Sequence, residues 1–594
     1  MRRKWKISAL LCAVLLLGAW LWLRMWQEGR QPVTVQDITV VVDGGSGSKH
    51  LRLWHNYYNN TEYLFLPAFC KAELPVRITL RRRGSVAWDG HASGGQGYLY
   101  DLTEGRHSLQ AGGSEFTVEV MRSASVPALF IYTASGSLTH IEEEKGNGES
   151  ALYEMVDADG QVIAAGQIRK LKSRGNSTFL EDKKPYQMSL EEGADLLGSG
   201  VQDKYILLAN RQDQSLLRDR IMYDLAADMG LAYSAVSRFV DLYINEEYRG
   251  SYQLSEKVET GYGRMPLATE TGRTRTAFLV TLEYPNDDRL AEADHYFTTE
   301  NGQNVIIKRP KQPGDAQKAY IADTFQAAEA AIRAGRVEES NIDMTSFARK
   351  YLVEEIGKNL DAMYTSQYFY QDEPEKDGKL YAGPVWDYDK TLGNPLIEHT
   401  RPVDFQEPRG IYAAMKQENA SWWYDLYQLP AFRQKVTEEY RESAVPAIEA
   451  MVNGKIDGYR NEIWESAHMD YMRWDTFEDF KYGEELEFEK EYQSEIDRIK
   501  EFLSLRRRFL DDIWLEGRKY DRISLDPGEG SIYVAYVDAI EGRTLNEPRD
   551  PKREGYRFDH WVREDTGEVY DFTECYDGIP FVLKAVYRPD GEDE

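Results

Sequence analysis

Cysteine and histidine are scarce in this chain. Its 594 residues include only three cysteines and nine histidines. Cys70 and Cys575 lie too far apart, and are too few, to form a disulfide framework. No histidine stands beside a plausible serine nucleophile, and none has the spacing of a zinc-binding pair. These absences argue against zinc peptidases and serine hydrolases, and they direct the search for chemistry to Asp, Lys, Arg and Asn.

Positive charge is also in short supply. The chain has 72 Lys and Arg against 100 Asp and Glu, which gives a net charge of -28. Phosphate backbones and anionic lipid surfaces attract basic proteins. We therefore expect no nucleic-acid partner. The hydrophobic share of 42% is that of an ordinary globular protein, and the chain length predicts three or four domains.

An apolar run near the N-terminus, residues 7–23, follows a cluster of basic residues and is closed by Arg24. About 17 residues is the lower limit for crossing a bilayer. No convincing cleavage site follows the run, and the basic residues on its leading side favour a cytoplasmic N-terminus. Residues 1–24 are therefore predicted to be a signal anchor or transmembrane segment of a single-pass cell-membrane protein with an extracellular body. If the segment is cleaved, the protein is secreted.

The rest of the chain divides into β-rich ends and a mixed centre. Residues 36–122 contain short β runs broken by Gly-rich turns, which predict a small β-sandwich domain. Residues 124–517 mix strands with helices, and residues 523–590 return to short β segments that predict a separate small β module. The predicted fold class is therefore α+β.

Three helices are expected in the central region. Ser215 is able to cap a helix that stops at Gly230, and a second helix begins near Thr345. A third helix is expected over residues 484–515, with a heavily charged outer face. The apolar stripes of these helices are interpreted as surfaces that pack on the core.

Two carboxylates, Asp387 and Asp389, lie in the aromatic, β-prone stretch from Pro384. In an extended strand, side chains two residues apart leave the same face, so these carboxylates would converge. Converging carboxylates repel one another unless a cation lies between them, and Mg²⁺ held by carboxylates, water and substrate phosphates meets that need. The alternative is a strand with two solvated aspartates.

Asp361 is expected to close a helix upstream of this pair. The β-prone residues 367–371, a polar turn at 373–378 and a return strand at 379–385 predict a hairpin that brings Asp361 near Asp387. Protein kinases use the same order of parts, because one Asp orients the attacking hydroxyl and a second Asp, beyond a hairpin, holds the metal. The order favours phosphoryl transfer, although the chain has no His-Arg-Asp motif, no Asp-Phe-Gly motif and no Gly-rich nucleotide loop.

Phosphoryl transfer also needs cations against the triphosphate. The candidates are Arg174, Lys184 and Lys308. Arg174 precedes a Gly-Asn turn whose backbone N–H groups are suited to assist anion binding. For each residue taken singly, the alternative is an ordinary surface cation.

Several motifs of the central region resemble the spore coat protein H (CotH) kinase family. They are Arg174-Gly175-Asn176-Ser177-Thr178, Lys183-Lys184-Pro185-Tyr186, Leu207-Leu208-Ala209-Asn210, Ser215-Leu216-Leu217-Arg218-Asp219, Val240-Asp241-Leu242-Tyr243-Ile244-Asn245, Tyr248-Arg249-Gly250-Ser251-Tyr252 with Glu256, and Val385-Trp386-Asp387-Tyr388-Asp389 through Gly393. The resemblance spans roughly residues 124–514. It implies an atypical protein-kinase-like fold that binds ATP with Mg²⁺ and phosphorylates serines of a protein substrate.

The resemblance also implies roles for single residues. Asp361 would be the catalytic aspartate, Asp387 the principal metal ligand, and Asp389 a second metal ligand. Glu256 and Glu283 stand where the family has acidic residues, and we assign them to the nucleotide site. The chain departs from many members at Ser366-Gln367, where they place an Asn, and this departure puts direct ligation of a second metal in doubt.

The last module resembles the internalin B-type, or Listeria-Bacteroides-type, repeat of bacterial surface proteins. The matching segments are Asn546-Glu547-Pro548, Lys552-Arg553-Glu554-Gly555-Tyr556, Phe558-Asp559-His560-Trp561 and residues 581–587. Such repeats are spacers or adhesion elements, and the fold alone does not define a function.

Three functions remain to be compared. The first is a Mg²⁺- and ATP-dependent atypical protein kinase displayed on the cell surface. The second is a surface binding or adhesion protein on an inactive kinase-like scaffold, which the scarcity of ATP outside cells favours. The third is a glycosidase with paired carboxylates, and it is disfavoured because it leaves the Lys and Arg motifs unexplained.

Overall fold

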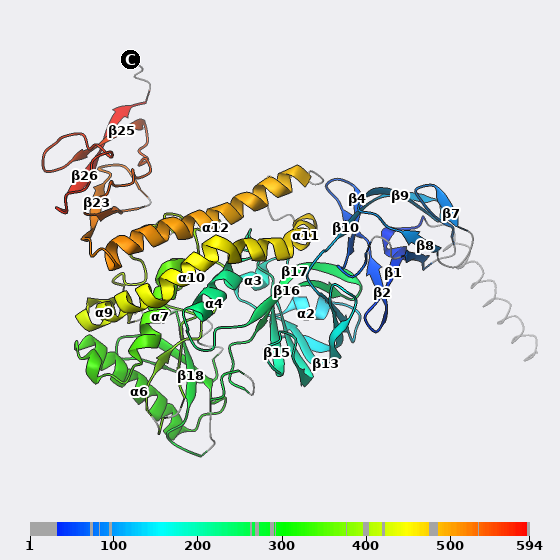
Figure 1. Cartoon of the computed structure of the whole chain (residues 1–594), viewed down its shortest axis with the longest axis horizontal. Coiled ribbons are helices and arrows are strands. Elements are labelled where there is room, and N and C mark those ends of the chain that lie inside the picture. Colours follow the sequence, from blue (N-terminus) through cyan, green and yellow to red (C-terminus); the bar gives the residue numbers. More distant parts are fainter. Residues whose placement is uncertain are drawn as a thin grey trace, which may run out of the picture. The chain divides into compact units, whose positions relative to one another are not determined.

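The computed structural model describes residues 32–590, apart from short gaps at 72–74, 82–83, 94–97, 262–263, 268–271, 285–289, 291–292, 373, 376, 396–402, 418–421, 475–484 and 533. Helices and sheets both contribute to the fold, which confirms the predicted α+β class (Figure 1). The described residues form two compact units. The first comprises those within Met1–Glu192, Phe239–Tyr252 and Glu462–Phe488, and the second those within Gly193–Arg238, Gln253–Asn461 and Glu489–Glu594.

The first unit begins with ten strands in two sheets. One sheet, in the order β2-β1-β5-β8, contains β1 (Ile38–Gly44), β2 (Gly47–Arg52), β5 (Pro75–Leu80) and β8 (Tyr98–Asp101). The other, in the order β3-β4-β10-β9-β6-β7, contains β3 (Trp54–Asn56), β4 (Thr61–Leu66), β6 (Val86–Trp88), β7 (His91–Ser93), β9 (Gly105–Ala111) and β10 (Ser114–Arg122). Strand β1 is rich in β-branched residues and its first five residues are buried, as expected of a strand at the core.

A second group of strands completes the first unit. Strands β11 (Ala128–Thr133), β12 (Gly148–Val156), β13 (Val162–Ser173) and β14 (Tyr186–Ala194) pair antiparallel in succession, and β16 (Ser237–Ile244) pairs parallel with β11. The short helices α2 (Thr139–Glu143) and α3 (Ser177–Leu180) lie between these strands in the sequence, and most of α11 (Ile456–Trp474) also belongs to this unit. The buried Lys183 ammonium contacts Asp470 of α11 at 2.6 Å.

The second unit contains a mixed core of sheet and helices. Strand β15 (Gln202–Leu208) pairs with the last residues of β17 (Glu247–Glu256). A five-stranded sheet, in the order β19-β20-β18-β21-β22, contains β18 (Phe278–Glu283), β19 (Tyr296–Thr298), β20 (Asn304–Arg309), β21 (Tyr368–Gln371) and β22 (Tyr381–Ala382). The helices are α4 (Arg218–Asp228), α6 (Asp315–Arg333), α7 (Met344–Gly357), α8 (Trp423–Gln428), α9 (Pro430–Glu439), α10 (Val445–Ala450) and most of α12 (Glu485–Trp514).

The three expected helices are present with small shifts at their ends. Helix α4 begins at Arg218, after a turn in which Ser215 Oγ accepts the N–H of Leu217, and it ends just before Gly230. Helix α12 spans nearly the predicted residues. Helix α7 ends at Gly357, so the expectation that Asp361 closes this helix is wrong. The physical reason is Lys358, whose φ of 48° is left-handed and ends the helical ladder.

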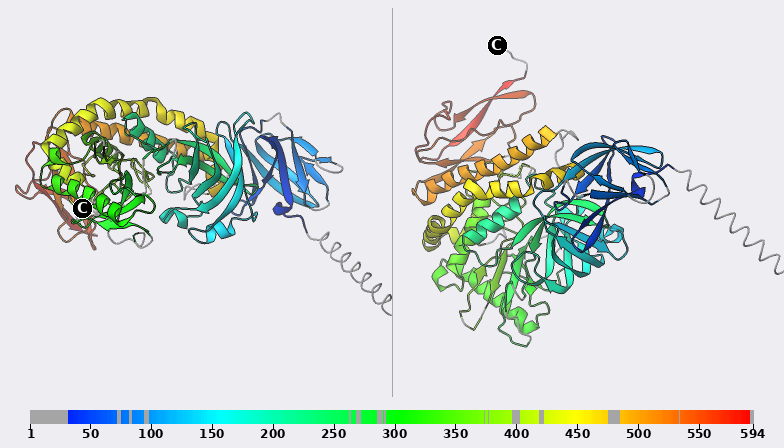
Figure 2. Two further views of the ribbon diagram at one scale, coloured as in Figure 1. Left: turned by 90° about the horizontal axis from the view of Figure 1, so that it is seen from below. Right: turned by 45° about the vertical axis from the view of Figure 1, so that its right-hand side comes forward.

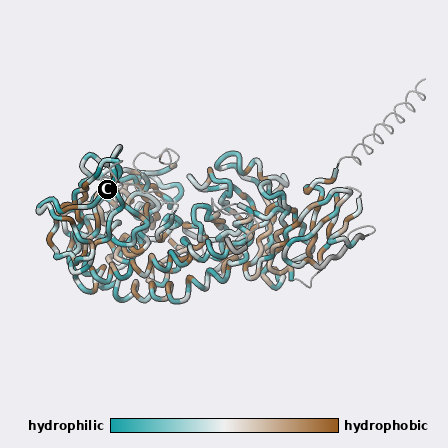
Figure 3. The backbone as a smooth tube through the Cα atoms, turned by 90° about the horizontal axis from the view of Figure 1, so that it is seen from above, coloured by the Kyte–Doolittle hydropathy of each residue, from teal (hydrophilic) through white to brown (hydrophobic). Residues whose placement is uncertain are grey.

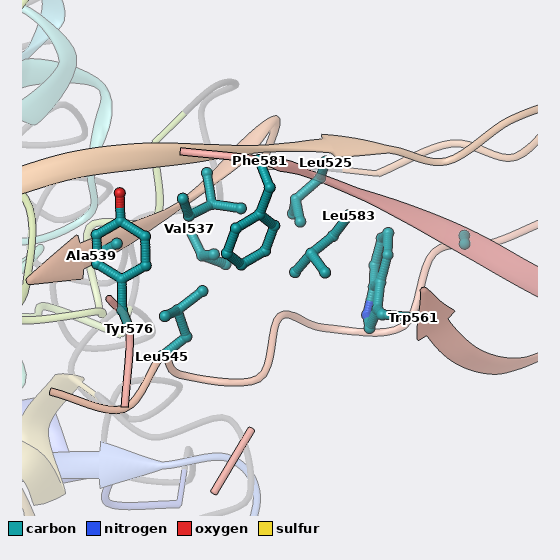
Figure 4. Packing of buried hydrophobic residues seen from close by; sticks show 10 residues of the cluster. Leu525, Val537, Ala539, Leu545, Trp561, Tyr576, Phe581 and Leu583 are labelled. Atoms are coloured by element: carbon teal, nitrogen blue, oxygen red, sulfur yellow. The ribbon is translucent and has the colours of Figure 1, made fainter. Parts of the chain in front are cut away.

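The C-terminal residues form a four-stranded sheet with its own small core. Its order is β24-β23-β26-β25, and its strands are β23 (Tyr520–Asp526), β24 (Tyr536–Ile540), β25 (Tyr556–Arg563) and β26 (Val582–Pro589), which appear in orange to red in Figure 2. Trp561, Phe581 and Leu583 are among the buried side chains that pack together in this core (Figure 4). The expectation of short β segments in this region is confirmed.

Hydrophobic and hydrophilic stretches are intermixed along the described chain (Figure 3). Within the described ranges, no helix is both long enough and apolar enough to cross a membrane. The predicted signal anchor, residues 1–24, lies outside those ranges.

Candidate functional site

The predicted hairpin is present, in a shorter form, as β21 and β22. Phe369 pairs with Ala382, and Tyr370 pairs with Tyr381. The hairpin brings the residues that flank it together, because Ser366 Oγ donates a hydrogen bond to Asp387 Oδ2 at 3.0 Å.

The acidic pair does not lie in a strand, which corrects the sequence prediction. Strand β22 ends at Ala382, and Asp387 has a left-handed φ of 74°. The N–H of Tyr388 donates to Asp219 Oδ1 at 2.7 Å instead of to a neighbouring strand. The argument that side chains two residues apart share a face therefore does not apply, and Asp387 is exposed while Asp389 is half-buried. Trp386 and Tyr388 are buried.

The carboxylates nevertheless lie close enough to one another to interact electrostatically. Burial raises the pKa of Asp389 well above its ordinary value, and the negative charges of Asp387, Asp219 and Asp361 raise it further. Burial, together with the charge of Asp387, raises the pKa of Asp219 to about 7. Asp219 lies in the first turn of α4. Acidic side chains from three separate segments thus act on Asp389, and a cation beside it would relieve that repulsion.

Asp361 lies in the turn that follows α7 and is half-buried. Its Oδ1 accepts a hydrogen bond from the Tyr284 hydroxyl at 2.9 Å, and its N–H donates to Asn359 Oδ1 at 3.1 Å. The ring of Tyr284 stacks on that of Tyr364, with 5.6 Å between the ring centroids. The Tyr284 hydroxyl thus fixes the Asp361 carboxylate, and Asn359 fixes the backbone of the same residue.

Of the two predicted glutamates, Glu283 lies beside this turn. It is buried at the end of β18, and its Oε1 accepts the Thr365 hydroxyl at 2.8 Å. Glu256 is buried at the end of β17 and is surrounded by donors: Ser199 Oγ at 2.9 Å, the N–H of Val236 at 3.0 Å and the Arg264 guanidinium at 2.9 Å. It lines a cavity of about 160 Å³ that also contacts Pro384.

The predicted cations are distributed over both units. Lys308 lies in β20 and is half-buried. It belongs to the second unit, as do Asp361, Asp387 and Asp389. Arg174 and Lys184 belong to the first unit. The Lys184 ammonium donates to the carbonyls of Phe179 and Glu181 at 2.7 and 2.5 Å, so two of its three N–H donors already have backbone acceptors.

The sequence reasoning missed the parts played by Asp219, Tyr284 and Glu354. Asp219 belongs to a quoted motif, and its place in the first turn of a helix, next to Arg218, was the available signal. Tyr284 directly follows Glu283, but its contact with Asp361 joins residues 77 positions apart in the chain. Glu354 is buried in α7 and accepts a hydrogen bond from the Tyr388 hydroxyl, 34 positions away in the chain.

The carboxylates of Asp387 and Asp389 are suited to supply part of the ligand set of a magnesium ion. Across the described part of the chain, no three His, Cys, Asp or Glu side chains are grouped closely enough to hold a metal ion by themselves. Mg²⁺ commonly uses only one or two carboxylates and completes its shell with water and substrate phosphates. Asp387 and Asp389 fit that requirement.

Comparison with known families identifies the chain. Protein kinases also use two acidic residues from separate segments, a catalytic-loop Asp and a metal-binding Asp. A family model described as CotH kinase protein matches residues 171–510. This segment is more than half of the chain, and the chain therefore belongs to the CotH kinase protein family. A search among curated proteins found no match.

Proposed function

We propose that this protein is an atypical protein kinase that transfers the γ-phosphoryl group of ATP, with Mg²⁺, to a serine of a protein substrate. The observation that carries the proposal is the electrostatic coupling of Asp361, Asp387 and Asp389 within one region of the family domain. Membership of a kinase family supports the reaction class. The serine substrate, ATP and Mg²⁺ are parts of the proposal.

The roles follow from the position of each side chain. Asp361, oriented by Tyr284 and Asn359, accepts the hydrogen bond of the serine hydroxyl and takes its proton as the new O–P bond forms and ADP leaves. Asp387 and Asp389 would hold Mg²⁺, which offsets charge on the phosphate oxygens. Arg174, Lys184 and Lys308 are the proposed phosphate contacts, and Glu256 and Glu283 the acidic residues of the nucleotide site.

We extend the proposal to the flanking parts of the chain. The central domain would have a protein-kinase-like fold, flanked by an N-terminal β-sandwich and a C-terminal internalin-type repeat. Residues 1–24 would anchor the protein in the membrane with its body outside the cell, and the family name suggests a role at the spore coat. These are proposals that the motifs support.

Transfer from labelled ATP tests the function directly. Purified protein with Mg²⁺ should label itself or a serine-containing protein substrate, and Asp361→Asn should lower the rate by about 100-fold or more, because general-base assistance contributes on the order of 10²- to 10⁴-fold. Asp159→Asn, at an exposed aspartate of the first unit, is the matched control. Equal transfer by the wild type and Asp361→Asn would refute the assignment of Asp361.

A surface binding protein on an inactive scaffold is the second candidate. Tyr57 and Tyr58 favour it, because they are 86% and 82% exposed in the turn between β3 and β4, where aromatic side chains suit a binding surface. Nucleotide binding separates the two functions. ATP with Mg²⁺ at about 100 times its Kd should stabilise a kinase by about 2.7 kcal/mol, and no stabilisation is expected of the inactive scaffold.

A further inference from the structure

A buried polar network on α7 lies between the two acidic segments. Lys350 and Glu354 are both fully buried, and the Lys350 ammonium contacts Glu354 Oε1. The Tyr388 hydroxyl donates to the same Oε1 at 2.6 Å, and Asn359 Nδ2 donates to Glu354 Oε2 at 2.7 Å. Lys350 also donates to the Tyr388 hydroxyl at 2.9 Å. Both oxygens of Glu354 are therefore engaged, each by a different segment of the chain.

Each branch of the network ends at a proposed functional residue. Asn359 Oδ1 accepts the N–H of Asp361 at 3.1 Å, so the first branch fixes the turn that carries the proposed catalytic aspartate. Tyr388 stands between Asp387 and Asp389 in the sequence, so the second branch fixes the segment that carries the proposed metal ligands. The Glu354 carboxylate is therefore linked to the first acidic segment through Asn359 and to the second through Tyr388.

The energetics favour a geometric role for this network. Desolvation offsets much of the attraction within a buried ion pair, so such a pair adds little net stability compared with apolar residues. A fully satisfied buried network, by contrast, defines one arrangement of its members, and removing one member leaves others unpaired.

We propose that Glu354 is a positioning residue that sets the placement of Asp361 relative to Asp387 and Asp389. Glu354 touches neither substrate nor metal, and acts through Asn359 on one side and Tyr388 on the other. The inference rests on the proposed kinase function for its catalytic consequence. Its structural consequence, a coupled ordering of the two acidic segments, does not depend on that function.

Glu354→Gln is the central variant, because the amide keeps one acceptor oxygen but turns an N–H group toward the second donor. A displacement of about 1 Å in a catalytic group costs on the order of 100-fold in rate. We expect kcat to fall by roughly 10- to 100-fold while KM for ATP stays within about twofold. Glu338→Gln, an identical change at an exposed glutamate, is the matched control and should leave both constants unchanged.

Hydrogen exchange measured on the same full-length proteins supplies a readout that needs no activity. Glu354→Gln should speed amide exchange in both residues 359–365 and residues 385–392, and Tyr388→Phe should speed it only in the second segment. If Glu354→Gln does not fold, Tyr388→Phe decides, since it removes one hydroxyl and keeps the ring. Wild-type exchange in both segments would overturn the inference, as would a loss of kcat that only tracks loss of folded protein. A wild type without phosphoryl transfer would refute the proposed function instead, and exchange alone would then decide the role of Glu354.

Discussion

At the scale of single residues, carboxylates with raised pKa values occur in both units. Asp219 and Asp389 in the second unit have raised pKa values because burial and neighbouring negative charges disfavour ionisation. Asp241 in the first unit is fully buried as well, and burial raises its pKa to about 6 although Tyr248 and Ser466 donate hydrogen bonds to it. These groups link folding stability to pH.

Asp241 gives the clearest pH prediction, because it lies in the first unit, away from the proposed metal ligands in sequence. In the unfolded chain an aspartate has a pKa of about 3.9. Between that value and the folded value of about 6, the native state binds a proton that the unfolded state has lost, so the free energy of unfolding falls as pH rises through this window. Asp241→Asn should flatten this fall. Urea unfolding at several pH values measures it.

Asp159→Asn serves as the control for this experiment, because Asp159 is exposed and should leave the pH dependence as it is in the wild type. If Asp241→Asn keeps the full decline between pH 4 and pH 6, Asp241 does not account for it and the raised pKa is wrong.

At the scale of secondary structure, helix α7 organises the site. Its N-terminus is capped by Asp343, whose side chain accepts the N–H of Ser346 at 2.8 Å. Its C-terminus is ended by the left-handed Lys358, and the turn beyond carries Asp361. Lys350 and Glu354 lie on the same helix. A substitution that disrupts either end of α7 should therefore also change the positions of the acidic residues.

The cap at Asp343 is a quantitative test of this element. Asp343→Ala should lower the free energy of unfolding by about 1 kcal/mol, the usual loss for a capping side chain. Asp343→Asn retains an acceptor oxygen and should recover most of the stability. Chemical denaturation measures both variants. Equal stability of the wild type and Asp343→Ala would show that the cap contributes nothing.

Much at this scale could be predicted from the sequence. The apolar spacing located α4, α7 and α12 to within a few residues, and the alternation of β-prone residues with a polar turn located the β21–β22 hairpin. The failures have a common cause in the backbone of single residues. Neither the left-handed φ of Asp387 nor that of Lys358 has a sequence signal, because non-glycine residues seldom adopt it. Glu354 was missed because Tyr388, its link to the second acidic segment, lies 34 positions away in the sequence.

At the scale of the whole molecule, the chain is acidic, with a net charge of -28, and it belongs to the CotH kinase protein family. Within the family domain, the negative charges of Asp387, Asp219 and Asp361 act on Asp389, and a bound cation would reduce their repulsion. The central claim is that this cation is Mg²⁺, held by Asp387 and Asp389 and shared with ATP.

Calorimetric titration of ATP into the full-length protein, with and without Mg²⁺, tests this claim most directly. We predict that the wild type binds ATP at least about tenfold more tightly with Mg²⁺, a difference of about 1.4 kcal/mol. Asp387→Asn should lose this difference, while the control Asp159→Asn should retain it. ATP binding that is equally tight with and without Mg²⁺, or a full Mg²⁺ dependence in Asp387→Asn, would contradict the account.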